Sequence, residues 1–195
     1  VLDAKEGAKL VYGHTAKTKE EFNDKINREQ WQELFIEEEV KAGDFFYIPA
    51  GTLHAIGEGI LIYEVQQNSD TTYRVYDYDR VDKDGNKREL HIEKTKDVTK
   101  VPFEKVTTSP KTEKLEGATV TYLADERYFS VFKVEVEGQV SLEKTRTGNL
   151  FTVLNGRGSV EIDGNIYDVK KGDSFILTTD CSKYTLKGNM FLVGS

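Results

Sequence analysis

The second half of the chain is a succession of short β-type runs, and this pattern restricts the possible fold more than any other feature. The runs are rich in Val, Phe, Tyr and Leu and are separated by turn signals such as Asp163-Gly164-Asn165. Strands at this spacing are typical of a β-sandwich or a small barrel. The expected strands are Thr119–Leu123, Tyr128–Val136, Leu150–Leu154, Gly158–Ile162, Ile166–Val169, Ser174–Thr178 and Met190–Val193.

A further β signal, in the first half, ends in a histidine. Gly43-Asp44 is a turn signal, Phe45–Ile48 is a short apolar run, and Pro49-Ala50-Gly51 predicts a second turn that ends it. His54 then opens the next expected strand. A histidine fixed by such a turn at the mouth of a barrel is well placed to bind zinc or iron through its neutral ring nitrogen. One histidine cannot hold a metal alone, so the stretch predicts a single ligand.

A short helical insertion is expected at about residues 18–35. Thr18–Glu21 has the form of a capping box, and Asn27–Gln30 repeats that form. Two short helices follow, and their apolar faces are expected to cover the end of a barrel. These faces carry Phe22 and Ile26 in the first helix and Trp31, Leu34 and Phe35 in the second.

Glu64 lies within an otherwise apolar run, Ile60–Val65, that is expected to form a strand. Because side chains alternate along a strand, Glu64 shares a face with two isoleucines of this run. If that face points into the barrel, Glu64 is buried near His54, and a buried acid needs a partner or a function. Pattern alone gives the solvent-facing alternative equal weight.

The segment Tyr73–Arg80 concentrates Arg, Tyr and Asp. Arg74 and Arg80 offer planar forks of donors that suit phosphate or carboxylate groups, so a polyhydroxylated anionic ligand is one interpretation. A solvated strand with cross-strand ion pairs is the other. Asp82–Lys87 is expected to be a hairpin tip, and His91, in a short helix spanning Glu89–Val98, is expected to be a surface residue.

Composition excludes several classes of function. The net charge of −7 and the pI near 5.1 come from interspersed acids and bases, which argues against nucleic-acid binding. The single cysteine, Cys181, excludes an internal disulfide and a Cys-based zinc site, so a reducing, cytoplasmic location is expected. No apolar run approaches the length of a membrane span. The chain begins at Val1, directly within an expected strand, and is therefore expected to be a fragment.

The chain is expected to contain two domains, residues 1–100 and residues 101–195, with a linker rich in Lys, Thr, Ser and Pro from Val101 to Gly117. Lys170–Leu177 echoes Val40–Tyr47 in sequence. The echo stops there, because no Pro-x-Gly-x-x-His pattern follows Asp173. The second domain is therefore expected to repeat the fold without the metal ligand and to have a structural role.

Two sets of residues carry a resemblance to a known family. Gly43 to His54 fits the second sequence motif of the cupins, which indicates a fold and not a function. The longer series of Pro49–His54, Glu64, Asn68-Ser69-Asp70 and Arg74 resembles the type I mannose-6-phosphate isomerases, particularly the short bacterial form. The resemblance implies a mainly β fold of two cupin-like jelly-roll or β-sandwich units. Residues 1–100 would then be the C-terminal portion of the catalytic cupin domain, and residues 101–195 a degenerate cupin-like domain.

The resemblance also implies a zinc-dependent isomerase that interconverts mannose 6-phosphate and fructose 6-phosphate, with one zinc ion per active site. His54 matches one metal ligand. Arg74 follows Glu64 by ten residues, as the family's catalytic arginine follows its glutamate, so both catalytic roles carry over. Arg80 falls where a basic residue contributes to substrate binding. The other zinc ligands lie upstream in the family, so this chain is expected to lack a complete zinc site.

Two other functions stay open at this point. A non-catalytic cupin module that binds sugars or regulates another protein would need no upstream ligands. An iron oxygenase would use two histidines and a carboxylate. Arg74 and its phosphate-type surroundings favour the isomerase over the oxygenase. The expected partner is a sugar phosphate, with no nucleic acid and no membrane, and the sequence predicts no oligomeric state.

Overall fold

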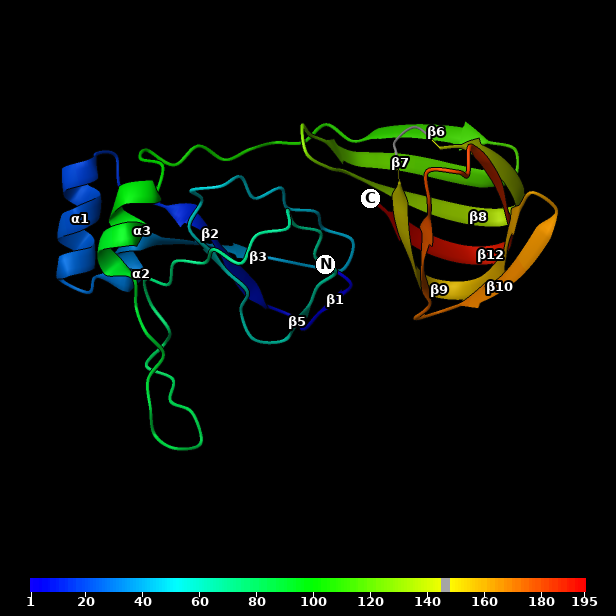
Figure 1. Cartoon of the computed structure of the whole chain (residues 1–195). Coiled ribbons are helices and arrows are strands. Elements are labelled where there is room, and N and C mark those ends of the chain that lie inside the picture. The colour runs from blue at the N-terminus through cyan, green and yellow to red at the C-terminus, as the bar shows by residue number, and fades with distance from the viewer. Residues whose placement is uncertain (145–147) are drawn as a thin grey trace. The chain divides into compact units, whose positions relative to one another are not determined.

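Antiparallel strands account for most of the regular structure, as expected from the sequence. The computed structural model describes residues 1–144 and 148–195, which form two compact units, residues 1–107 and 108–195 (Figure 1). The expectation of a mainly β fold with a short helical insertion is confirmed. No helix in the described part of the chain is long and apolar enough to cross a membrane.

The second unit is one antiparallel sheet of seven strands. Its order is β10-β9-β12-β8-β7-β6, and β11 pairs with β9. Figure 1 shows these strands wrapping around a common interior. The bounds are β6 Lys111–Leu115, β7 Ala118–Asp125, β8 Ser130–Glu143, β9 Asn149–Ile162, β10 Asn165–Lys170, β11 Ser174–Leu177 and β12 Lys183–Gly194.

Two details of the second unit differ from the expectation. Lys111–Leu115 lies within the expected linker but forms β6, which pairs with β7 in the register Lys111↔Tyr122 to Leu115↔Ala118. The expected strands Leu150–Leu154 and Gly158–Ile162 form one continuous strand, β9. The glycine between them, Gly156, has a φ of 78° and does not end the strand.

Side chains fill the interior of the second unit. Alternate residues of β8 point inward, so Val134 and Val136 are 0% and 1% exposed, while Glu135 between them is exposed. Cys181 is buried in the same cluster, which agrees with a packing role. The other large members of this core are Phe132, Phe151, Val153, Val160, Leu177, Tyr184, Leu186, Met190 and Leu192.

The first unit has two small sheets and three helices. One sheet has the order β3-β2-β4 and the other pairs β1 with β5. The strands are β1 Asp3–Ala4, β2 Lys9–His14, β3 Phe35–Glu39, β4 His54–Ala55 and β5 Ile60–Leu61. The helices are α1 Lys19–Asn27, α2 Trp31–Leu34 and α3 Ile92–Val98.

The expected helix start at Thr18 is confirmed. Thr18 is the N-cap of α1, and its side chain accepts a hydrogen bond of 3.2 Å from the backbone N–H of Glu21. At the other end of the helical region, the Lys19 ammonium donates to the carbonyl oxygens of Lys96 and Thr99 and so caps the last turn of α3. The second predicted capping box is wrong, because Asn27 is the last residue of α1 rather than an N-cap.

The helical insertion buries the predicted faces. Phe22, Ile26 and Leu34 are 0%, 3% and 0% exposed and share a cluster with Val11 and Leu53. Trp31 and Phe35 are partly buried at the edge of that cluster. A separate cluster contains Leu10, Tyr12 and Val40, with Phe46 and Ile48 packed against it.

Two of the expected strands in the first unit are absent or shortened. Phe45–Ile48 lies outside any strand, although Phe46 and Ile48 pack against the core. The run Ile60–Val65 pairs only at Ile60 and Leu61, which oppose Ala4 and Asp3 of β1. A strand requires a partner for its backbone groups, and within the described residues the ladder stops at Leu61.

Candidate functional site

Two turns shape the segment that presents His54. At the first, Gly43 has a φ of 94°, and the Asp44 carboxylate accepts a hydrogen bond of 2.9 Å from the backbone N–H of Lys41. At the second, Gly51 lies so close to the end of α3 that an added Cβ would be 2.7 Å from the Val98 carbonyl oxygen. Glycine is therefore required there for close backbone approach.

His54 opens β4, as predicted, and a hydrogen bond to the backbone orients its ring. It opposes Tyr12 of β2, and its Nδ1 lies 3.0 Å from the Thr52 carbonyl oxygen. A carbonyl accepts only, so Nδ1 carries the proton and donates. The lone pair of Nε2 is then available on an exposed side chain, which is the arrangement of a histidine that binds a metal.

The described residues do not bring a second metal ligand to His54. No group of three or more His, Cys, Asp or Glu side chains suited to a metal occurs in residues 1–144 and 148–195. His14 is buried, with Nε2 at 2.9 Å from the Lys100 carbonyl oxygen. His91 is half-buried and not the surface residue expected. Its Nδ1 accepts a hydrogen bond of 3.2 Å from the backbone N–H of Arg74.

Glu64 is exposed and lies beyond the end of β5. Of the two alternatives that the pattern left open, the structure has the solvent-facing one. Across the part of the chain that the structure describes, no recorded hydrogen bond or ion pair joins Glu64 to His54 or Arg74. The desolvation expected for a carboxylate inside a barrel is therefore not present at this side chain.

The carboxylate of Asp77, which the sequence analysis did not predict as a site residue, lies between Arg74 and Arg80. Asp77 is buried, with its side chain 7% exposed. Its Oδ1 lies 2.7 Å from Nη2 of Arg80 and 3.9 Å from Nε of Arg74. Arg88 adds a bidentate contact, because its Nε lies 2.8 Å from Oδ2 and its Nη2 donates a hydrogen bond to Oδ1. The site thus contains three guanidinium groups around one acid.

The charges around Asp77 keep it ionised. The hydrogen bonds from Arg88 lower the pKa of the Asp77 carboxyl most, and the contacts of Arg80 add to the effect, against the opposing influence of burial. One sequence signal was available, because Asp77 lies three residues after Arg74 and three before Arg80. Local spacing could not predict the contact of Arg88, because the Asp82–Lys87 hairpin lies between Arg88 and Asp77 and brings them together.

Aromatic rings lie beside this cluster. Trp31 stacks on Tyr76 with ring centroids 4.9 Å apart, and Tyr76 contacts Tyr78 at the same distance. Arg80 lies over the ring of Tyr78, 5.7 Å from its centroid. Of the two interpretations of Tyr73–Arg80, the solvated strand is wrong, because the segment contains no strand residues.

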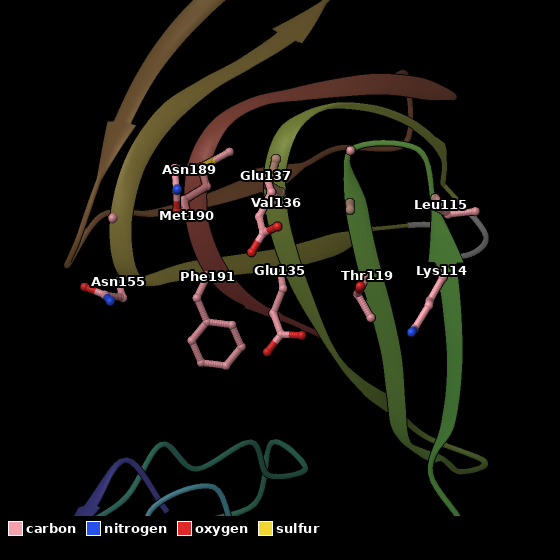
Figure 2. Close-up of a pocket in the computed structure, with 13 residues that line it drawn as sticks. Lys114, Leu115, Thr119, Glu135, Val136, Glu137, Asn155, Asn189, Met190 and Phe191 are labelled. Atoms are coloured by element: carbon pink, nitrogen blue, oxygen red, sulfur yellow. The ribbon is translucent and has the colours of Figure 1, made fainter.

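The second unit has a hollow of about 600 Å³ on its outward face, shown in Figure 2. In-register residues of neighbouring strands form a row across it: Asn155, Phe191, Glu135, Thr119 and Lys114. None of the residues predicted for the site lines it. The row combines a carboxylate, a carboxamide, a hydroxyl, an ammonium and a phenyl ring.

Comparisons with known proteins show what the chain as a whole is similar to. Residues 118–195 match the family described as mannose-6-phosphate isomerase, cupin domain, so the second unit is a cupin domain. Mannose-6-phosphate isomerase of Streptococcus mutans is 42% identical over all 195 residues. Mannose-6-phosphate isomerase ManA of Bacillus subtilis is 43% identical over 188 residues, or 96% of this chain.

A solved structure extends the likeness to three dimensions. A crystal structure of the mannose 6-phosphate isomerase from Bacillus subtilis matches 100% of this chain with a TM-score of 0.95 and 39% identity. The resemblance of the whole chain to the mannose-6-phosphate isomerases is thus confirmed. It spans 61% of the length of the Streptococcus mutans relative, 60% of ManA and 62% of the solved structure.

Proposed function

We propose that this chain is part of a zinc-dependent isomerase that interconverts mannose 6-phosphate and fructose 6-phosphate. The observation that carries the proposal is the similarity of the whole chain to mannose-6-phosphate isomerases, at 42% identity in sequence and a TM-score of 0.95 in structure. The exposed, backbone-oriented imidazole of His54 and the arginine cluster around Asp77 support it. The proposed substrate is a sugar phosphate, and the proposed location is the cytoplasm.

In this proposal, Arg74 is the cation that stabilises the enediolate formed when a proton moves between C1 and C2 of the sugar. Preorganised donors aimed at developing negative charge contribute strongly to such reactions. Glu64 is proposed as the base or as the residue that orients it, and Arg80 as a contact to the substrate. Because Glu64 is exposed in this chain, its catalytic role requires a covering that removes water from it.

His54 fits a zinc ion as one ligand, since its Nε2 is directed away from the Thr52 carbonyl contact. Zinc, when bound, would polarise the sugar oxygens as a Lewis acid. The remaining ligands are proposed to come from the part of the relatives that this chain does not span. The described residues do not provide them, because they contain no three-ligand cluster.

The test compares this 195-residue chain with one extended to the length of the relatives. Zinc content is measured by mass spectrometry, and fructose 6-phosphate formation from mannose 6-phosphate by a coupled assay. We expect zinc and activity in the extended chain only, loss of zinc in its H54Q variant, and retained zinc with about 10²–10³-fold lower kcat in R74K. Stoichiometric zinc or isomerisation in the 195-residue chain would contradict the proposal.

The alternative function is a non-catalytic cupin module that binds sugars or regulates another protein. The exposed Glu64 and the single ligand His54 favour it, since a binding module needs neither a desolvated base nor a complete metal site. An extended chain that binds fructose 6-phosphate but neither retains zinc nor forms product would establish this alternative.

A further inference from the structure

Asp77 receives more positive charge than a buried carboxylate needs. The bidentate contact with Arg88 already gives each of its oxygens a charged donor. Arg80 nevertheless adds a contact of 2.7 Å, and Arg74 lies at 3.9 Å. Three guanidinium groups and one carboxylate leave a net charge of +2 at this point of a chain whose total charge is −7. Asp79 does not offset this surplus, because it pairs with Lys87 at 2.6 Å.

Two of the three arginines keep donors directed to solvent. Arg80 uses Nε and Nη2 on the backbone carbonyl and the carboxylate of Asp77. Arg88 uses the same two nitrogens on the carboxylate. A guanidinium has five N–H groups, so each arginine retains three among its contacts in the described residues. Their side chains are 61% and 52% exposed, which leaves these donors open to a ligand.

The backbone is strained where it turns Arg80 toward Asp77. Tyr78 and Asp79 have φ values of 55° and 53°, a left-handed conformation that is unfavourable for non-glycine residues. The turn brings the N–H of Arg80 to 3.1 Å from the Asp77 carbonyl oxygen and lays the guanidinium over Tyr78. Strain of this kind persists where the surroundings over-determine a conformation, which is common at ligand sites.

We propose that Arg88 is a further substrate-binding residue and that Asp77 is the positioning residue that holds Arg88 and Arg80 to receive the phosphate of the sugar phosphate. This inference rests on the proposed function and refines it. A phosphate dianion matches the net charge of +2, and its oxygens suit two guanidinium forks held by one carboxylate. Arg74 lies at the buried side of the cluster, with a side chain 26% exposed, and links it to the proposed enediolate site.

The experiment measures binding to this 195-residue chain by calorimetry, with fructose 6-phosphate, inorganic phosphate and fructose as probes. We expect R88Q to bind both phosphate-bearing probes about 10–100-fold more weakly, because a charge-assisted contact is lost. R88K, which keeps the charge without the fork, should fall between R88Q and the unchanged chain. D77N should lose selectivity for fructose 6-phosphate over fructose.

Arg28 provides the matched control. It is an exposed arginine of the same unit, 67% exposed and paired with Asp24 at 3.0 Å, so R28Q should bind all probes like the unchanged chain. No binding of either phosphate-bearing probe, or equal weakening in R28Q and R88Q, would overturn the inference. In an extended chain that isomerises mannose 6-phosphate, an unchanged KM in R88Q would overturn this inference while leaving the proposed function intact.

Discussion

Acidification is expected to destabilise the first unit through His14, whose imidazole is buried and short of one hydrogen-bond partner. The residue is 3% exposed, and Nε2 donates to the Lys100 carbonyl oxygen at 2.9 Å. Nδ1 is buried and has no partner in the described part of the chain. Burial lowers the pKa of His14 below its usual 6.5; Lys19 and Lys17 also lower it, while the Lys100 carbonyl and Glu21 oppose the shift.

The sign and size of the effect follow from proton linkage. The folded unit holds His14 neutral, whereas the unfolded chain takes up a proton as the pH falls below 6.5, so the free energy of unfolding falls with the pH. Between pH 7.5 and pH 5.5 the loss is at most about 1.4 kcal/mol, the limit for a ring that stays neutral while folded. Stability from this group is therefore present above pH 6.5 and lost below it.

Trp31 provides the assay. It is the sole tryptophan and packs against the cluster that contains Phe22, a ring that lies 4.7 Å from His14. Urea unfolding followed by its fluorescence at the two pH values gives the loss for the unchanged chain and for H14F, whose difference isolates this imidazole. H54Q removes an exposed imidazole as the control. Equal losses in the unchanged chain and H14F would refute the reasoning.

Three further outcomes are expected from the packing. T18A should lower the stability of the first unit by about 1 kcal/mol in the same fluorescence assay, because α1 loses its N-cap. K19M should speed amide hydrogen exchange in α3 selectively, because the last carbonyls of that helix lose their ammonium cap. L186A should destabilise the second unit by about 2–5 kcal/mol in calorimetry, since this side chain is fully buried.

Local patterns predicted the elements that local chemistry determines. The apolar run Tyr128–Val136 predicted a strand, and β8 covers most of it, with Val134 and Val136 in the core. Thr18 marked a helix start because its side chain serves the nearby N–H of Glu21, a contact within one turn. Sequence alone was sufficient at Thr18, whose partner lies three residues away, but it failed at the second capping box, where Asn27 ends α1 instead of starting a helix.

The expectations failed where the partner lies far away in sequence. Phe45–Ile48 and Ile62–Val65 have the composition of strands, yet a strand also needs a neighbour for its backbone, and the runs themselves do not specify one. Arg88 reaches Asp77 only because the intervening hairpin folds back. The fold brings the three arginines together around the buried Asp77. No spacing in the local sequence therefore predicts that Arg88 joins Arg74 and Arg80.

The repeated Lys-x-Gly-Asp sequence shows how one local structure serves both units. Asp44 and Asp173 each accept a hydrogen bond of 2.9 Å from the backbone N–H of the lysine three residues earlier, and the glycine before each has a φ of 94°. The two turns are thus the same by geometry as well as by sequence.

The two units differ in the residues that follow this turn. After the second turn, β11 ends at the buried Leu177, in an interior filled by side chains. After the first, the chain leads to an exposed histidine whose recorded contact is through Nδ1. The turn therefore belongs to the fold, and the residues that follow it separate a packed cupin core from a candidate metal ligand.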